Sequence, residues 1–204
     1  MSESSDLGKS GTGSWSVARR RGAKTTSGRS KSTKPKPASP ARATAARSPR
    51  KIGYSRDKGV DDFVRQVCEA TPLQLVEMER HGVAGTFLKD LAKHLKVPAV
   101  RMFDMLGVPK ATAEKKSSAG EVITGSGGHA AIGMAKLLGI ALEIVANSTA
   151  TGAAEFDAAA WLGEWLGRPQ PSLGGRAPGQ LMDTPTGVEM VARLLGAVES
   201  GAYQ

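Results

Sequence analysis

Residues 171–187 read PSLGGRAPGQLMDTPTG and contain four glycines and three prolines. A flexible linker can have this composition, but the segment lies between two apolar stretches with helical spacing. On its N-terminal side, EFDAAAWLGEWLGRP places Trp161 and Trp165 four residues apart, on one helix face. Gly167 ends that helix, and Pro169 prevents its continuation.

On the C-terminal side, DTPTGVEMVARLLGAVESG predicts a second helix that ends at Gly201. Thr184 is a candidate N-cap with Pro185 next, and Thr186 with Glu189 offers a competing capping box. The core stripe of this helix consists of Val188, Val191, Leu195 and Val198. The quoted segment, here named the connector, therefore joins two short helices that must pack together.

The connector contains its own turn signals. Gly174 and Gly175 permit a turn with positive φ, which other residues resist. Leu173 and Leu181 supply apolar side chains that can hold the segment against the helices. Arg176 has two interpretations: its guanidinium either pairs with a carboxylate of a partner or bonds to carbonyls of the connector itself.

Further toward the N-terminus, the chain also has helical spacing. Thr71, Pro72 and Gly82 predict the N-cap, first residue and end of one helix. Two breaks follow, at Val97-Pro98 and at Gly107-Val108-Pro109. The stripes before and after the first break consist of Phe87, Leu88, Leu91, Ala92 and Leu95, then Val100, Met102, Phe103 and Leu106.

Two breaks 11 residues apart between short amphipathic helices indicate a helix-turn-helix, and two registers compete. The first register has Lys96 at the position of the turn glycine, with Leu91, Ala92, Leu95, Val97, Met102 and Met105 as its apolar residues. The second register has Gly107 in the turn, with Met102, Leu106 and Val108 in place but Phe103, Ala113 and Lys116 as poor fits.

The second register places a recognition helix at about 109–118. Its predicted DNA-binding residues, which suit phosphates and base edges, are Lys110, Thr112, Lys115 and Lys116. The alternative is that these are ordinary solvated positions of a helical bundle.

GEVITGSGGHAAIG, residues 120–133, is expected to interrupt the helices as a flexible connection before an apolar helix at about 129–146. Anion binding by its glycines is the weaker alternative, because no strand precedes them. No arrangement of catalytic side chains stands out, and Cys68 is the single cysteine. We therefore expect no catalytic residue, no metal site and no cofactor, and no apolar run of membrane-spanning length.

The net charge of +9 is unevenly distributed. Residues 1–58 contain 15 Lys and Arg against 3 Asp and Glu, whereas residues 59–204 contain 13 against 16. The first segment is rich in Ser, Thr, Pro and Ala and has little to bury, which predicts a disordered basic tail. It could attract phosphate backbones without reading sequence, or could act only as a solubilising extension.

The C-terminal residues resemble the toxin-binding domain of Xre/MbcA/ParS-type antitoxins. The resemblance is dense over about residues 155–201 and rests on Trp161-Leu162, Pro169, Pro171, Leu173-Gly174-Gly175, Pro178, Leu181, Thr184, Gly187, Val191, Leu194-Leu195, Val198 and Gly201. It implies a bacterial antitoxin, not itself an enzyme, that covers the NAD cleft of a RES-domain toxin and dimerises. The implied toxin-binding residues are Leu173, Gly174, Gly175, Arg176, Gln180, Glu199 and Tyr203.

The sequence thus predicts an all-α protein of the cytoplasm in three parts: a disordered basic tail (1–58), an Xre-like helix-turn-helix domain (59–146) and a small helical toxin-binding domain (147–204). The expected partners are a RES-domain toxin, operator DNA and a second copy of the chain, with no membrane. A DNA-binding regulator or nucleoid-associated protein without a toxin is the alternative, and an enzyme is the least favoured hypothesis.

Overall fold

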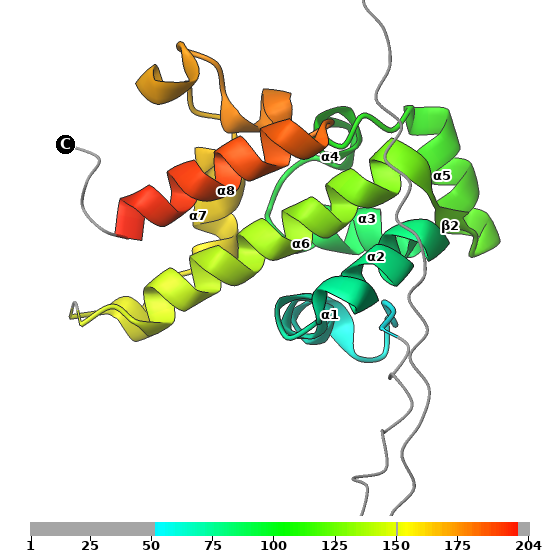
Figure 1. The fold of residues 1–204 in the computed structure, drawn as a ribbon, viewed down its shortest axis with the longest axis horizontal. Helices are drawn as coiled ribbons and strands as arrows, with labels where there is room; N and C mark the ends of the chain where they lie inside the picture. Colours follow the sequence, from blue (N-terminus) through cyan, green and yellow to red (C-terminus); the bar gives the residue numbers. More distant parts are fainter. Residues whose placement is uncertain (1–51, 150, 200–204) are drawn as a thin grey trace, which may run out of the picture. The chain divides into compact units, whose positions relative to one another are not determined.

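The computed structural model describes residues 52–149 and 151–199, and the chain divides by its internal contacts after Ala45. The second unit, Ala46–Gln204, is built almost entirely of helices (Figure 1), which confirms the predicted all-α class. Its α-helices are α1 (Gly59–Cys68), α2 (Pro72–His81), α3 (Gly85–His94), α4 (Ala99–Met105), α5 (Lys110–Ala119), α6 (Gly125–Ala146), α7 (Ala158–Trp165) and α8 (Pro185–Glu199).

Short elements complete the described fold. Two-residue strands β1 (Val83–Ala84) and β2 (Val122–Ile123) pair antiparallel, with Val83 opposite Ile123. Single turns of 3-10 helix follow at η1 (Ala153–Glu155), η2 (Pro171–Leu173) and η3 (Pro178–Leu181). The last two lie within the connector.

Helix α6 is the centre of the fold. In Figure 1 it runs across the whole unit, with α1 and α2 on one side and α7 and α8 on the other. Small residues of α6 allow the close approach: a Cβ on Gly133 would lie 2.7 Å from a Val188 methyl carbon of α8. One continuous core therefore includes side chains from both predicted folded domains.

The length and apolar character of α6 correct one expectation. Its 22 residues include an 18-residue window with a mean hydropathy of 1.6, so a run of membrane-spanning length and composition does exist. Half of that window is buried inside the described unit. Its role here is that of a core helix, and composition alone does not distinguish the two cases.

The start of α6 corrects a second expectation. Gly125, Gly127 and Gly128 do not form a flexible connection but belong to the first turn and a half of the helix. Gly127 and Gly128 are buried, and a Cβ on Gly128 would lie 2.6 Å from the carbonyl oxygen of Ile123. Glycines that indicated a flexible segment in the sequence instead allow the helix to lie close against a neighbouring backbone.

The predicted tail also overlaps the folded unit. Tyr54 packs edge-on against Phe63 and tilted against Phe87, and its hydroxyl donates a 2.8 Å hydrogen bond to Asp90. Arg56 donates to the same carboxylate at 2.8 Å. The segment 52–58, predicted to be disordered, is therefore part of the fold, because the ring of Tyr54 packs against two other aromatic rings. The rest of the predicted tail, 1–51, lies outside the described residues.

These contacts shift the pKa values of the groups involved. Partial burial and the Asp90 hydrogen bond raise the pKa of the Tyr54 hydroxyl. Partial burial alone would raise the pKa of Asp90, but hydrogen bonds from Arg56 and Tyr54 outweigh it, and the net shift is downward.

Helices α3, α4 and α5 are joined by two turns of the same design. Val97 N donates to Ala92 O and Val108 N to Phe103 O, both at 2.9 Å. Each turn continues into a proline, and Pro98 and Pro109 share φ −56° and ψ 135°. Each turn has one position at positive φ, which is occupied by Lys96 (φ 54°) in the first turn and by Gly107 in the second.

Candidate functional site

The connector folds back on itself as a closed loop. Gln170 and Arg176 form an isolated antiparallel bridge, with Gln170 N donating to Arg176 O at 3.0 Å. Gly174 and Gly175 lie between them at φ 65° and 78°, in open space. These two glycines are therefore required by backbone conformation, as the sequence predicted, and Figure 1 shows this loop standing out beyond α7 and α8.

The loop is fixed to the helices at both ends. Leu173 and Leu181 are half-buried and pack against the core. The side-chain oxygen of Gln180 accepts a 3.2 Å hydrogen bond from Ala177 N. Thr184 Oγ1 accepts from Gly187 N at 3.1 Å, so Thr184 caps α8.

Arg176 is exposed and lies where the loop closes, opposite Gln170. In the described parts of the chain its side chain has no hydrogen bond and no ion pair, so bonding to the connector's own carbonyls is not observed. Its backbone, by contrast, is held by the bridge to Gln170. Of the other predicted toxin-binding residues, the side chain of Glu199 and all of Tyr203 lie outside the described residues.

The predicted DNA-binding residues lie on α5. Lys110, Thr112 and Lys115 are exposed, as a recognition helix requires. Lys116 differs, because it is half-buried and its Nζ donates a 2.8 Å hydrogen bond to Val122 O of β2. Lys116 thus ties α5 to the small sheet. Ala113 and Ser117 are the buried residues of α5.

Helix α4, the recognition helix of the first register, has different surroundings. Met102, Phe103 and Met105 are buried, and α4 packs against η3 of the connector. Val100, expected in the apolar stripe, is 46% exposed. The guanidinium of Arg101 lies over Gly167 at the end of α7, so a Cβ at that position would collide with it.

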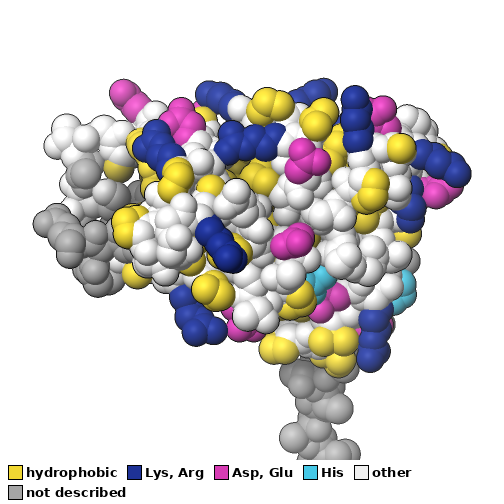
Figure 2. All heavy atoms as spheres, turned by 90° about the horizontal axis from the view of Figure 1, so that it is seen from above, with side chains coloured by type: hydrophobic (Ala, Val, Ile, Leu, Met, Phe, Trp, Pro, Cys, Tyr) yellow, Lys and Arg dark blue, Asp and Glu magenta, His cyan; other side chains and the backbone are white. Residues whose placement is uncertain are grey.

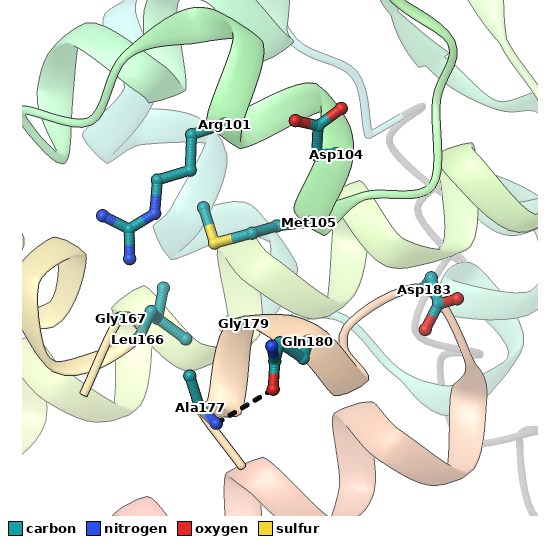
Figure 3. A pocket seen from close by; sticks show the side chains of 9 residues that line it. All are labelled: Arg101, Asp104, Met105, Leu166, Gly167, Ala177, Gly179, Gln180 and Asp183. Carbon is teal, nitrogen blue, oxygen red and sulfur yellow. Dashed lines mark hydrogen bonds between the residues drawn. The ribbon is translucent and has the colours of Figure 1, made fainter. Parts of the chain in front are cut away.

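A pocket of about 360 Å³ opens between α4 and the connector (Figure 3). Its lining consists of Arg101, Asp104, Met105, Leu166, Gly167, Ala177, Gly179, Gln180 and Asp183. Of these residues, only Gln180 was predicted from the sequence as a site residue. Gly167 and Gly179 lie where a side chain would fill the pocket. In the sequence, a helix end or a turn explains a glycine at these positions equally well.

A second contact joins the first turn to α7. Lys96 Nζ lies 2.7 Å from Asp157 Oδ2, while Asp157 Oδ1 accepts a 2.9 Å hydrogen bond from Ala160 N and caps α7. These two hydrogen bonds lower the pKa of the Asp157 carboxyl. Lys96, which as a non-glycine residue resists positive φ, is thus held by Asp157 from the C-terminal part of the chain.

The described surface is of mixed charge. On the face in Figure 2, Lys and Arg side chains are spread out, with Asp and Glu side chains between them. Residues 59–204 carry three more acidic than basic residues, so the excess positive charge of the chain is in residues 1–58. Among the residues the structure describes, no three His, Cys, Asp or Glu side chains form a metal-binding group.

Comparisons with known proteins identify the C-terminal part of the chain and a relative that covers most of it. Residues 142–201 match the C-terminal toxin-binding domain of Xre/MbcA/ParS antitoxins. A protein of Sphingobium sp. (strain YBL2), named "Prs ADP-ribosylating antitoxin", is 34% identical over 150 residues, which cover 73% of this chain and 93% of the relative.

The chain belongs to the Xre/MbcA/ParS family of antitoxins. It is thus the antitoxin of a toxin–antitoxin pair, and its C-terminal module, including the connector, is a toxin-binding domain. The matched region begins at residue 142, within α6 and five residues before the predicted domain boundary at 147.

Proposed function

We propose that this antitoxin neutralises a RES-domain toxin, an NAD-consuming enzyme of ADP-ribosyltransferase type, by covering its NAD cleft with the connector. The name of the Sphingobium relative associates that protein with ADP-ribosylation, the same chemistry. The antitoxin acts by binding, without an enzymatic activity of its own, in the cytoplasm and as a homodimer within the complex.

The observation that carries the proposal is the rigid presentation of Arg176. The bridge to Gln170, two glycines at positive φ and the half-buried Leu173 hold its backbone, while its side chain has no bond among the described residues. A preformed surface loses little entropy on docking and can therefore inhibit tightly. Residues 147–204 carry 3 basic and 6 acidic residues, which suits a cleft built for the phosphates of NAD.

We propose further that α5 binds the operator of the antitoxin's own operon. Helix α5 carries exposed Lys110, Thr112 and Lys115, whereas α4 is packed against the connector. This difference favours the second helix-turn-helix register. The basic residues of segment 1–51 would add attraction to phosphates that does not depend on sequence.

NAD turnover by a purified RES-domain toxin, titrated with the full-length antitoxin, tests the first proposal. The toxin to purify for this test is a RES-domain protein whose gene lies next to the antitoxin gene. Truncation after Ala146 is a poor test, because it would uncover core residues of α6 that α8 covers. Point variants of the whole chain are sharper.

Arg176→Glu should leave the fold intact and weaken inhibition, by on the order of 2–5 kcal/mol if the pair is buried in the complex. Gly174→Val should lower both stability and inhibition, because φ 65° strains a β-branched residue even in open space. Arg168→Gln, an exposed change two residues before the loop that gives up only a surface ion pair with Glu164, is the matched control. Wild-type protein that leaves NAD turnover unchanged would refute the proposal.

A DNA-binding regulator without a toxin partner is the second candidate, favoured by the exposed basic residues of α5. It predicts operator binding by the antitoxin alone that is unaffected by addition of the RES-domain toxin.

A further inference from the structure

We propose that the toxin-binding surface extends beyond the family-matched residues onto α4, and that the pocket lined by Arg101 receives an acidic side chain of the toxin. This inference rests on the proposed function, since it names a second place where the same partner is held. Its residues come from α4, from the end of α7 and from the connector, so the fold has to be complete before the pocket exists.

Two glycines keep the pocket open. A Cβ on Gly179 would lie 2.6 Å from Met105 Sδ and 2.9 Å from Leu166 O, and a Cβ on Gly167 would collide with the Arg101 guanidinium. The pocket volume of about 360 Å³ falls in the lower part of the range of ligand-binding pockets. Side chains at either glycine would fill the space that an entering group needs.

The charges in the pocket determine what it can receive. Arg101 has no ion pair and no hydrogen bond from its side chain within the described ranges. Figure 3 shows its guanidinium on the side of Leu166 and Gly167, whereas the Asp104 carboxylate is directed away from Met105. A carboxylate that enters can accept two parallel hydrogen bonds from such a guanidinium.

The surroundings of Arg101 select the rest of the partner segment. Met105 and Leu166 are buried apolar residues that line the pocket together with Arg101, so they present an apolar wall next to an ion pair formed there. Asp104 and Asp183, both exposed and without an ion pair among the described residues, lie at the edges. The pocket therefore fits a toxin segment in which an acidic residue has basic neighbours.

Arg101 has a competing structural explanation, because a cation at the C-terminal end of α7 is favoured by the helix dipole. That role needs no partner and predicts no effect on toxin affinity. A third role follows from the first helix-turn-helix register, which would make α4 the recognition helix and bring its exposed Arg101 to the operator DNA. Affinities for the toxin and for the operator, measured on the same variants, separate the three roles.

The first experiment measures the affinity of full-length Arg101→Glu and Arg101→Lys for the purified RES-domain toxin, with thermal melting and operator binding alongside. We expect Arg101→Glu to weaken toxin binding about 30-fold or more, with unchanged operator binding. Arg101→Lys should lose less, because it keeps the charge but not the two parallel bonds. Arg80→Glu, an exposed reversal on α2, should match the wild type.

The second experiment needs no change in Arg101 and decides the case if Arg101→Glu fails to fold. A photo-crosslinking amino acid at Asp104 should form an adduct with the toxin in the complex, and one at Lys115 should not. Unchanged toxin affinity of a folded Arg101→Glu variant, or a complex without an adduct at 104, overturns the inference while the proposed function stands. Failure of the wild-type protein to bind the toxin overturns both.

Discussion

Helices α4 and α5 follow turns of the same design, yet their surroundings differ. Three of the seven residues of α4 are buried, and its exposed Arg101 lies against the end of α7. Only two of the ten residues of α5 are buried, and its lysines at 110 and 115 face solvent. Identical local structure is thus used once to join the two halves of the fold and once to present a surface.

A repeated turn pattern can therefore predict a helix-turn-helix without choosing its recognition helix. The choice depends on what covers each helix, and here η3 of the connector packs against α4. The connector thereby has two roles in the fold, because it presents Arg176 outward and covers α4 inward.

Helices α4 and α5 should differ most strongly in their contributions to stability. Met102→Ala in α4 should lower the free energy of unfolding by about 2–5 kcal/mol, because Met102 is fully buried and a cavity would remain. Thr112→Ala in α5 should change it by less than about 0.5 kcal/mol. Urea denaturation followed by circular dichroism measures both, and equal losses would contradict the contrast between buried α4 and exposed α5.

The next effect separates the helices by DNA affinity. Lys110→Ala and Lys115→Ala should each weaken specific operator binding, by roughly 1–3 kcal/mol where the side chain reads a base edge. Arg101→Ala should leave operator binding unchanged. Fluorescence anisotropy with labelled operator at fixed salt provides the measurement. Loss of binding on altering Arg101 alone would mean that α4 is the recognition helix.

A smaller effect concerns the residues at positive φ in the two turns. Gly107→Ala should destabilise by roughly 1 kcal/mol, because φ 63° is unfavourable for alanine and its Cβ would lie 3.1 Å from Asp183 Cβ. Lys96→Gly should change stability less, because relief of the strain at φ 54° offsets loss of the ion pair with Asp157. Chemical denaturation that found Lys96→Gly the more harmful of the two would show that the ion pair dominates.

The smallest effect is a pH dependence at the first turn. Asp157→Asn keeps an oxygen for the Ala160 N–H but removes the charge that pairs with Lys96. Because the folded-state pKa of Asp157 is lowered, its stabilisation is present above the ordinary Asp pKa of about 3.9 and is lost as the pH falls through the folded value. Melting temperatures of wild type and variant should thus differ slightly at pH 7 and converge in acid.

Features that depend on neighbouring residues could be predicted from the amino-acid sequence. Thr71, Pro72 and Gly82 mark the bounds of α2. Gly174 and Gly175 both adopt positive φ, as predicted for the turn in the connector. Such signals are legible because a cap or a left-handed turn is satisfied within a few residues. The spacing of apolar residues likewise predicted the all-α class and the buried stripe of α3.

Tertiary structure decided whatever depends on distant contacts. In α6, Gly128 lies against the backbone of β2 and Gly127 against the side chain of Val108, and Tyr54 of the predicted tail packs against Phe63 and Phe87. The pocket of Arg101 exists only where α4, α7 and the connector meet. Whether a position is buried or open depends on segments that are far apart in the chain, so the sequence of one segment alone does not predict it.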